Sequence, residues 1–110
     1  MLWSLCVKTK AGFKSEYSGK AGRQIGGEAI LNAHHLLGKP NFALRYSLDS
    51  GICLTNGEHN FTAHSTSRSY LITDFVGEER MNRLKALKQV TMKADYKMKE
   101  IELTELLKTL

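Results

Sequence analysis

Residues 28–36, EAILNAHHL, alternate between two sets of side chains, and this alternation most constrains the fold. The first set is Ala29, Leu31, Ala33 and His35, and the second is Glu28, Ile30, Asn32 and His34. A period of two is typical of a β-strand, in which neighbouring residues point to opposite faces. We therefore expect His34 and His35 to have different roles, rather than to bind one ligand together.

The chain has 110 residues, which is enough for one domain with a modest core, so we expect a single domain over 1–110. Its apolar fraction of 42% and charged fraction of 25% are typical of a folded globular protein. The formal net charge of +5 favours an anionic partner such as nucleic acid.

The two cysteines and the apolar segments indicate a cytoplasmic protein that is not associated with a membrane. Cys6 and Cys53 form neither a CxxC pair nor a disulfide framework. The first residues, MLWSLCVKTK, reach a lysine after few apolar residues, unlike a secretory signal. No apolar stretch approaches the length of a membrane span.

Several further elements are expected around the first strand. Residues 1–10 read as a short amphipathic helix, and the Gly-, Ser- and Lys-rich segment 14–27 as a loop with tight turns. Segment 38–51 is expected to be a loop that contains Pro40, and 52–55 a second short strand. Asn56 is a candidate cap for a helix that begins at Gly57.

The remainder of the chain is expected to be helical. Apolar residues recur at helical spacing before Gly77, again over 81–90, and once more over 92–110. The order of elements is therefore strand, strand, helix, with helices at both ends, which is an α+β fold.

All four histidines lie in one central window, at positions 34, 35, 59 and 64. Neutral imidazole is a ligand for divalent transition metals and is also the commonest general base. A divalent cation beside a positioned base is what phosphodiester hydrolysis requires. The window therefore predicts a hydrolytic metal site.

The segment AHHLLGKPNFALRYSLDSGICLTNGEHNFTAH, residues 33–64, resembles the motif of the HNH (ββα-metal, His-Me finger) endonucleases of phages and prophages. The resemblance implies a metal core over about 28–66 and a helical tail over about 67–110, similar to the C-terminal helices of those nucleases. It also implies nicking of DNA with little sequence preference, with one divalent ion (Mg, Mn, Ni or Zn) as cofactor.

The resemblance assigns roles to the four histidines. His34 would bind the metal, His35 would activate water as the general base, and His59 would complete the metal site. His64 lies where the family often has a further ligand or a phosphate contact. On a regular helix, residues five apart lie about 140° around the axis from each other. His64 can therefore join His59 at one metal only on a distorted helix, or on one that ends early.

Ser50 occupies the position of the asparagine that orients the base in this family. A serine can form such a hydrogen bond but reaches less far, so Asp49 and Asn41 are alternatives for this role. Lys39 and Arg45 could bind DNA phosphates, although loop charges of this kind are often only solvated.

Two further segments resemble the zinc knuckle of the family, with its four cysteines replaced. KSEYSGK is similar to KCxxCGK, and LTNGEH is similar to LCxxCH. Ser15, Ser18, Thr55 and Glu58 stand in the cysteine positions, and these residue types are poor substitutes for thiolates, so no structural zinc is expected. Hydrogen bonds among these four residues, together with apolar packing, would hold this region instead.

Two other functions are compatible with the sequence. One is a DNA-binding module that keeps the nuclease fold but has lost efficient catalysis, which Ser50 and the missing cysteines favour. The other is a metal-binding protein with a structural role.

Overall fold

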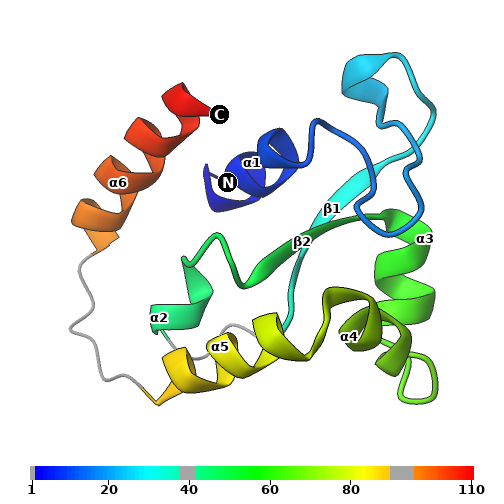
Figure 1. The fold of residues 1–110 in the computed structure, drawn as a ribbon. Coiled ribbons are helices and arrows are strands. Elements are labelled where there is room, and N and C mark those ends of the chain that lie inside the picture. Colours follow the sequence, from blue (N-terminus) through cyan, green and yellow to red (C-terminus); the bar gives the residue numbers. More distant parts are fainter. Residues whose placement is uncertain (1, 38–41, 90–95) are drawn as a thin grey trace.

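The computed structural model describes residues 2–37, 42–89 and 96–110 of the chain (Figure 1). Two antiparallel strands, β1 (Leu31–His35) and β2 (Gly51–Thr55), form a sheet with helices packed against both of its faces. α1 (Leu2–Lys10) precedes the strands. The segments after them are α3 (Asn56–Glu58), a π-helical turn (His59–Ala63), α4 (Tyr70–Val76), α5 (Glu78–Lys88) and α6 (Tyr96–Thr109). The expected α+β class and the strand-strand-helix order are confirmed.

The register of the two strands fixes which face each histidine occupies. His34 pairs with Ile52, and His35 pairs with Gly51. Paired residues in an antiparallel sheet share a face, so His34 and His35 point to opposite sides, as the alternation predicts. Gly51 lets α1 approach closely the face of the sheet on which His35 lies, because a Cβ there would lie 2.6 Å from Val7 and 2.7 Å from Trp3.

One hydrophobic cluster joins the two ends of the chain across the His35 face of the sheet. Its buried members are Trp3, Cys6, Val7, Leu31, Cys53 and Leu103. They come from α1, both strands and α6, so the expected packing of the N- and C-terminal helices is present. The Sγ atom of Cys6 lies 3.5 Å from the carbonyl oxygen of Leu103 in α6.

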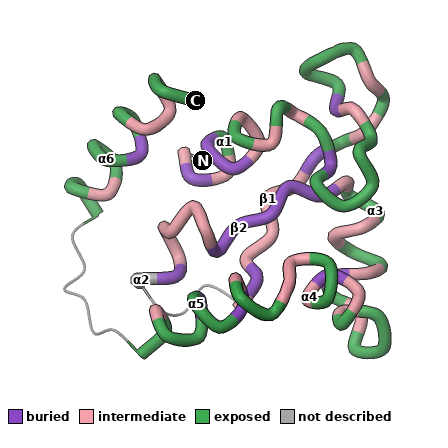
Figure 2. The backbone as a smooth tube through the Cα atoms, in the orientation of Figure 1, coloured by how far each residue is buried: buried purple, intermediate pink, exposed green. Residues whose placement is uncertain are grey.

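A second cluster covers the opposite face, where His34 lies. Its buried members are Leu36, Leu44, Ile52, Leu54, Ala63, Ile72, Met81 and Leu84. Figure 2 shows a continuous stretch of buried residues along β2, between the helices of the two faces. The sheet therefore separates two cores, and each histidine is supported by a different one.

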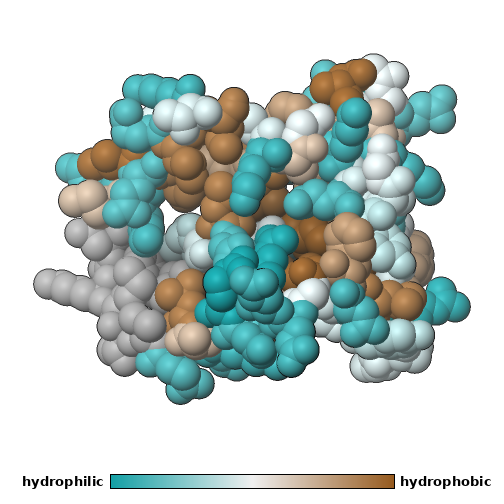
Figure 3. Space-filling view, viewed as in Figure 1, coloured by the Kyte–Doolittle hydropathy of each residue, from teal (hydrophilic) through white to brown (hydrophobic). Residues whose placement is uncertain are grey.

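The helical tail is built from amphipathic segments. α4 ends at Gly77, which adopts φ +96, and the predicted helix stop is confirmed. α5 buries Met81 and Leu84 and turns its charged side chains outward, where they form the hydrophilic area at the front of Figure 3. Val90 and Met92, part of the expected apolar pattern, lie outside the described residues.

Two local expectations are wrong. Segment 38–51 is not wholly a loop, because Phe42–Arg45 forms the short helix α2, whose Leu44 is buried in the second cluster. A single turn is too short to show a helical period in the sequence. The cap of α3 is Thr55 rather than Asn56, since the Thr55 hydroxyl accepts from Glu58 N and the Glu58 carboxylate accepts from Thr55 N.

Among the described residues, no helix combines the length and apolar character that crossing a bilayer requires.

Candidate metal centre

Three imidazoles from β1 and the π-helical turn converge on the His34 face of the sheet. One ring nitrogen each from His34, His59 and His64 lies within 4.8 Å of the others. The His34 ring centroid is 5.2 Å from that of His59 and 5.1 Å from that of His64. The Nε2 atoms of His59 and His64 are 3.0 Å apart. We call these residues the three-histidine group.

The π-helical turn is what brings His64 to the group. The amide of His64 donates to the carbonyl of His59 over 3.2 Å, a bond that spans five residues. In a π-helix residues five apart return to nearly the same side, whereas on a regular α-helix they would be about 140° apart. The distortion that the sequence argument required for His64 to join the site is therefore present.

The surroundings keep the rings of His34 and His59 neutral. Burial, followed by the charges of His59, His64 and His35, lowers the pKa of His34 to about 4. Burial and the charge of His64 lower the pKa of His59 as well. Metal ligation needs an unprotonated imidazole nitrogen, so these two groups are in the competent form at neutral pH without losing a proton.

The donor set fits a divalent transition metal. Zinc–nitrogen bonds of about 2.0–2.1 Å at tetrahedral angles separate ligand atoms by about 3.3 Å. The 3.0 Å between the Nε2 atoms of His59 and His64 is close to that value. Three imidazoles that leave a fourth position free are the ligand pattern of a catalytic rather than a structural zinc site.

His35 lies on the other face of β1 and is held at both its flat face and its edge. Its ring stacks on Trp3, with centroids 3.9 Å apart and planes inclined by 7°. Its Nε2 atom lies 3.0 Å from the carbonyl oxygen of Arg45. A carbonyl only accepts, so Nε2 carries the proton in this contact, and in the neutral ring Nδ1 is the unprotonated nitrogen.

The Ser50 side chain contacts the end of α2, which carries the Arg45 carbonyl, and the residues that follow it. Its buried hydroxyl lies within hydrogen-bond distance of the carbonyl oxygens of Leu44 and Ser47, on either side of Arg45. Its influence on His35 is therefore through the main chain. The alternative that Asp49 orients the base is wrong, because its carboxylate pairs with Arg80 and Arg83 on α5.

The expected phosphate contacts are only partly described. Arg45 ends α2 and its guanidinium lies 5.4 Å from the ring centroid of Tyr46. Lys39, like Asn41 among the alternatives for orienting the base, lies outside the described residues.

The four residues that the resemblance aligns with the cysteines of a zinc knuckle converge around one carboxylate, that of Glu58. Ser15 Oγ donates to Glu58 Oε1, and the same oxygen accepts from Thr55 N at 2.9 Å. Burial raises the pKa of Glu58, but the hydrogen bonds from Ser15, Ser18 and Thr55, together with the charge of Lys20, outweigh burial and leave it lowered. A carboxylate thus occupies the place that a cation would have in a knuckle.

The same loop is also joined to the sheet. Glu16 N donates to the Cys53 carbonyl at 2.9 Å, and Cys53 N donates to Glu16 Oε2 at 2.7 Å. The loop that contains Ser15 is therefore hydrogen-bonded along the outer edge of β2. Through Ser15 and Glu58 it is also bonded to α3, which directly precedes His59.

Sequence reasoning missed the supports of the two histidine sites. The sequence argument gives Trp3 no role at the site, because its contact with His35 joins residues too distant in sequence for any local pattern to show. Asn32 and Asn60 both donate to Asn56 Oδ1, at 2.9 and 3.0 Å, which ties β1 to the π-helical turn. The position of Asn32 on the His34 face was the signal for this contact.

Comparisons of the chain with models of known protein families, with curated proteins and with solved structures found no match.

Proposed function

We propose that this protein is a metal-dependent endonuclease of the HNH (ββα-metal) type, which hydrolyses phosphodiester bonds of DNA. One observation carries the proposal: a group of three imidazoles that could hold a metal ion includes His34, and the next residue of β1 is a fourth imidazole held in one orientation. His34 belongs to a group of three imidazoles, while the next ring, His35, is oriented by a carbonyl and an aromatic face. The order of strand, strand and helix and the resemblance of residues 33–64 to the HNH motif support the same assignment.

The residues would divide the work as follows. The nitrogens of His34, His59 and His64 would hold a divalent ion, which supplies charge stabilisation at the phosphate and at the leaving oxygen. His35 would accept a proton from water at Nδ1, because its Nε2 is engaged by the Arg45 carbonyl. Trp3 and that carbonyl keep the ring in one orientation, and the net charge of +5 attracts the anionic substrate.

A second candidate function is a DNA-binding module with little catalytic power. It is favoured by Ser50, whose hydroxyl is bonded to main-chain carbonyls of the 44–47 loop. In this case the Ser50 hydroxyl is engaged by the main chain instead of by the base, unlike the asparagine of the HNH motif.

A nicking assay on supercoiled plasmid separates the two functions. We expect nicked circles with at least one of Mg, Mn and Ni, none in chelator, and none from the His35→Ala variant with any of these metals. Failure to nick in every metal, combined with a gel shift in chelator, would support the DNA-binding module. Absence of both nicking and a shift would exclude both functions.

A further inference from the structure

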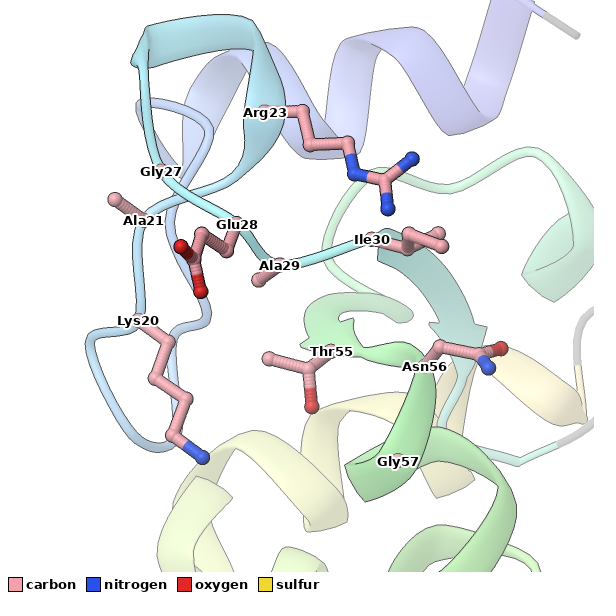
Figure 4. Close-up of a pocket in the computed structure, with 10 residues that line it drawn as sticks. All are labelled: Lys20, Ala21, Arg23, Gly27, Glu28, Ala29, Ile30, Thr55, Asn56 and Gly57. Atoms are coloured by element: carbon pink, nitrogen blue, oxygen red, sulfur yellow. The ribbon is translucent and has the colours of Figure 1, made fainter.

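A cavity of about 650 Å³ opens beside the start of α3, apart from the three-histidine group. Its walls come from the 20–30 segment on one side and from the end of β2 and the first residues of α3 on the other (Figure 4). Side chains that line it include Lys20, Arg23, Glu28, Ile30 and Asn56. None of the four histidines lines it, so it is a separate feature of this surface.

The cavity and the three-histidine group are joined along one face of β1. Asn56, which lines the cavity, accepts hydrogen bonds from Asn32 and from Asn60. Asn32 lies two residues before His34 on the same face of the strand, and Asn60 follows His59 directly. Ile30 and His34 are four positions apart in the chain, a distance of about 13 Å at 3.3 Å per residue. A strand of nucleic acid that crosses the metal centre can therefore reach the cavity within a few nucleotides.

The charges at the cavity match a single phosphodiester. Lys20 and Arg23 contribute two positive charges and Glu28 one negative charge, which leaves a net charge of +1. Among the described residues, the Arg23 side chain has neither a hydrogen bond nor an ion pair, and its guanidinium extends across the cavity toward Ile30 (Figure 4). Lys20 is partly engaged, since its charge acts on Glu58.

The remaining walls supply a further donor and an apolar surface. Both hydrogen bonds of Asn56 use Oδ1, so its Nδ2 donor is available to an acceptor oxygen. Ile30 is 50% exposed and offers an apolar surface of the kind that packs against a sugar or a base. Donors together with one apolar side chain suit a nucleotide better than a free inorganic anion.

We propose that this cavity is a nucleotide subsite, in which Arg23 and Asn56 bind a backbone phosphate of the substrate strand a few nucleotides from the cleaved bond. The proposal rests on the proposed function, since it takes the substrate to be a nucleic acid. Arg23 is then a binding residue that sets where along the strand the metal centre acts.

The test measures binding of a labelled DNA duplex to the full chain in chelator, over a range of salt concentrations. Arg23→Ala is compared with Lys97→Ala, which removes the same charge from the exposed surface of α6, far from the cavity (Figure 1). We expect Arg23→Ala to lower affinity severalfold more than Lys97→Ala and to reduce the salt slope by about one. Arg23→Lys should restore the slope.

A second arm identifies the phosphate. Neutral methylphosphonate groups are placed one at a time along one strand, and the duplexes are bound to the parent and to Arg23→Ala. At one position, the methylphosphonate should weaken binding of the duplex to the parent but not to Arg23→Ala. Equal behaviour of Arg23→Ala and Lys97→Ala, or the lack of such a position, would overturn the subsite. The subsite would also be overturned if Arg23→Ala weakened the binding of inorganic phosphate but not of the duplex. A parent protein that binds no nucleic acid would instead overturn the proposed function itself.

Discussion

His59 and His64 are five residues apart in the chain, yet their Nε2 atoms lie 3.0 Å apart because the segment between them is a π-helical turn. A π-helical turn is equivalent to one residue inserted into an α-helix, and such turns are frequent at functional sites. The pairing of these two side chains is therefore a property of the turn and not only of the residue types.

Deletion of Phe61 should convert this turn into a regular α-helix while keeping the metal. The two histidines would then be four residues apart, a spacing that shares a face. Phe61 is 73% exposed, so little core packing is lost. Calorimetry should find metal affinity within about tenfold of the parent, or about 1.4 kcal/mol. A loss of affinity as complete as in His59→Ala would show that the turn does more than place His64.

Substitution of the two neighbouring histidines should separate metal binding from catalysis. His34→Ala and His59→Ala should weaken metal binding and cleavage together, since both remove a ligand. His35→Ala should lower cleavage by about 10²–10⁴-fold with nearly unchanged metal affinity, because a general base is not a ligand. Titration calorimetry and the nicking rate are the measurements. Equal loss of metal from His35→Ala and His34→Ala would contradict the assignment.

Glu58→Ala should destabilise the fold without a metal being involved. The substitution removes the carboxylate that accepts hydrogen bonds from the Ser15 hydroxyl and from the Thr55 amide at the start of α3. The expected loss is about 1–3 kcal/mol in the free energy of unfolding, measured by urea denaturation in chelator. Glu105→Ala, in an exposed pair on α6, is the matched control and should change stability by less than about 0.5 kcal/mol.

Placing cysteines at the four positions that the resemblance aligns with a zinc knuckle should create a zinc site. Ser15, Thr55 and Glu58 are already joined by hydrogen bonds, and Ser18 also acts on Glu58. The quadruple variant with Cys at positions 15, 18, 55 and 58 should bind one additional zinc per chain by elemental analysis, and its stability should become chelator-sensitive. A folded variant that gains no zinc would show that these positions do not correspond to a knuckle.

Stability should fall in alkaline solution through Cys53. Burial and the neighbouring Glu16 raise the pKa of its thiol from 9.0 to about 11. Between these values the unfolded state has released the proton and the folded state has kept it, so the free energy of unfolding decreases as the pH rises. The contribution is complete below pH 9.0 and lost by about pH 11, a few kcal/mol at most. Urea titrations under reducing conditions should show a shallower decline for Cys53→Ala, and an identical decline would exclude this thiol as a cause.

The sequence predicts those features that depend on a short period or on neighbouring residues. The period of two in β1 separates His34 from His35 because strand geometry requires it. The cap was misplaced by one residue because Asn and Thr are both good caps, although Glu58 three residues after Thr55 forms the capping-box pattern that distinguishes them. The choice between Thr55 and Asn56 as the cap is decided by the number of hydrogen bonds that each could form with Glu58. The sequence alone contains that information.

The rest depends on contacts between distant residues. The stacking of Trp3 on His35 follows from the way α1 lies across the sheet, which requires Gly51 beneath it. The π-helical turn leaves no periodic signature over five residues, and its buried residue, Ala63, packs into the second cluster. These features arise from tertiary packing that overrides local preference.

The contact between α1 and α6 also sets an order of events during synthesis of the chain. Trp3, which supports His35, shares its hydrophobic cluster with Leu103, and Cys6 lies against the carbonyl of Leu103, 97 residues further on. The three-histidine group, by contrast, needs no residue of α6. On a ribosome, the three-histidine group can assemble while the support of His35 is still incomplete. Under the proposed function, the nascent chain would therefore gain its metal ligands before the orientation of its base is complete.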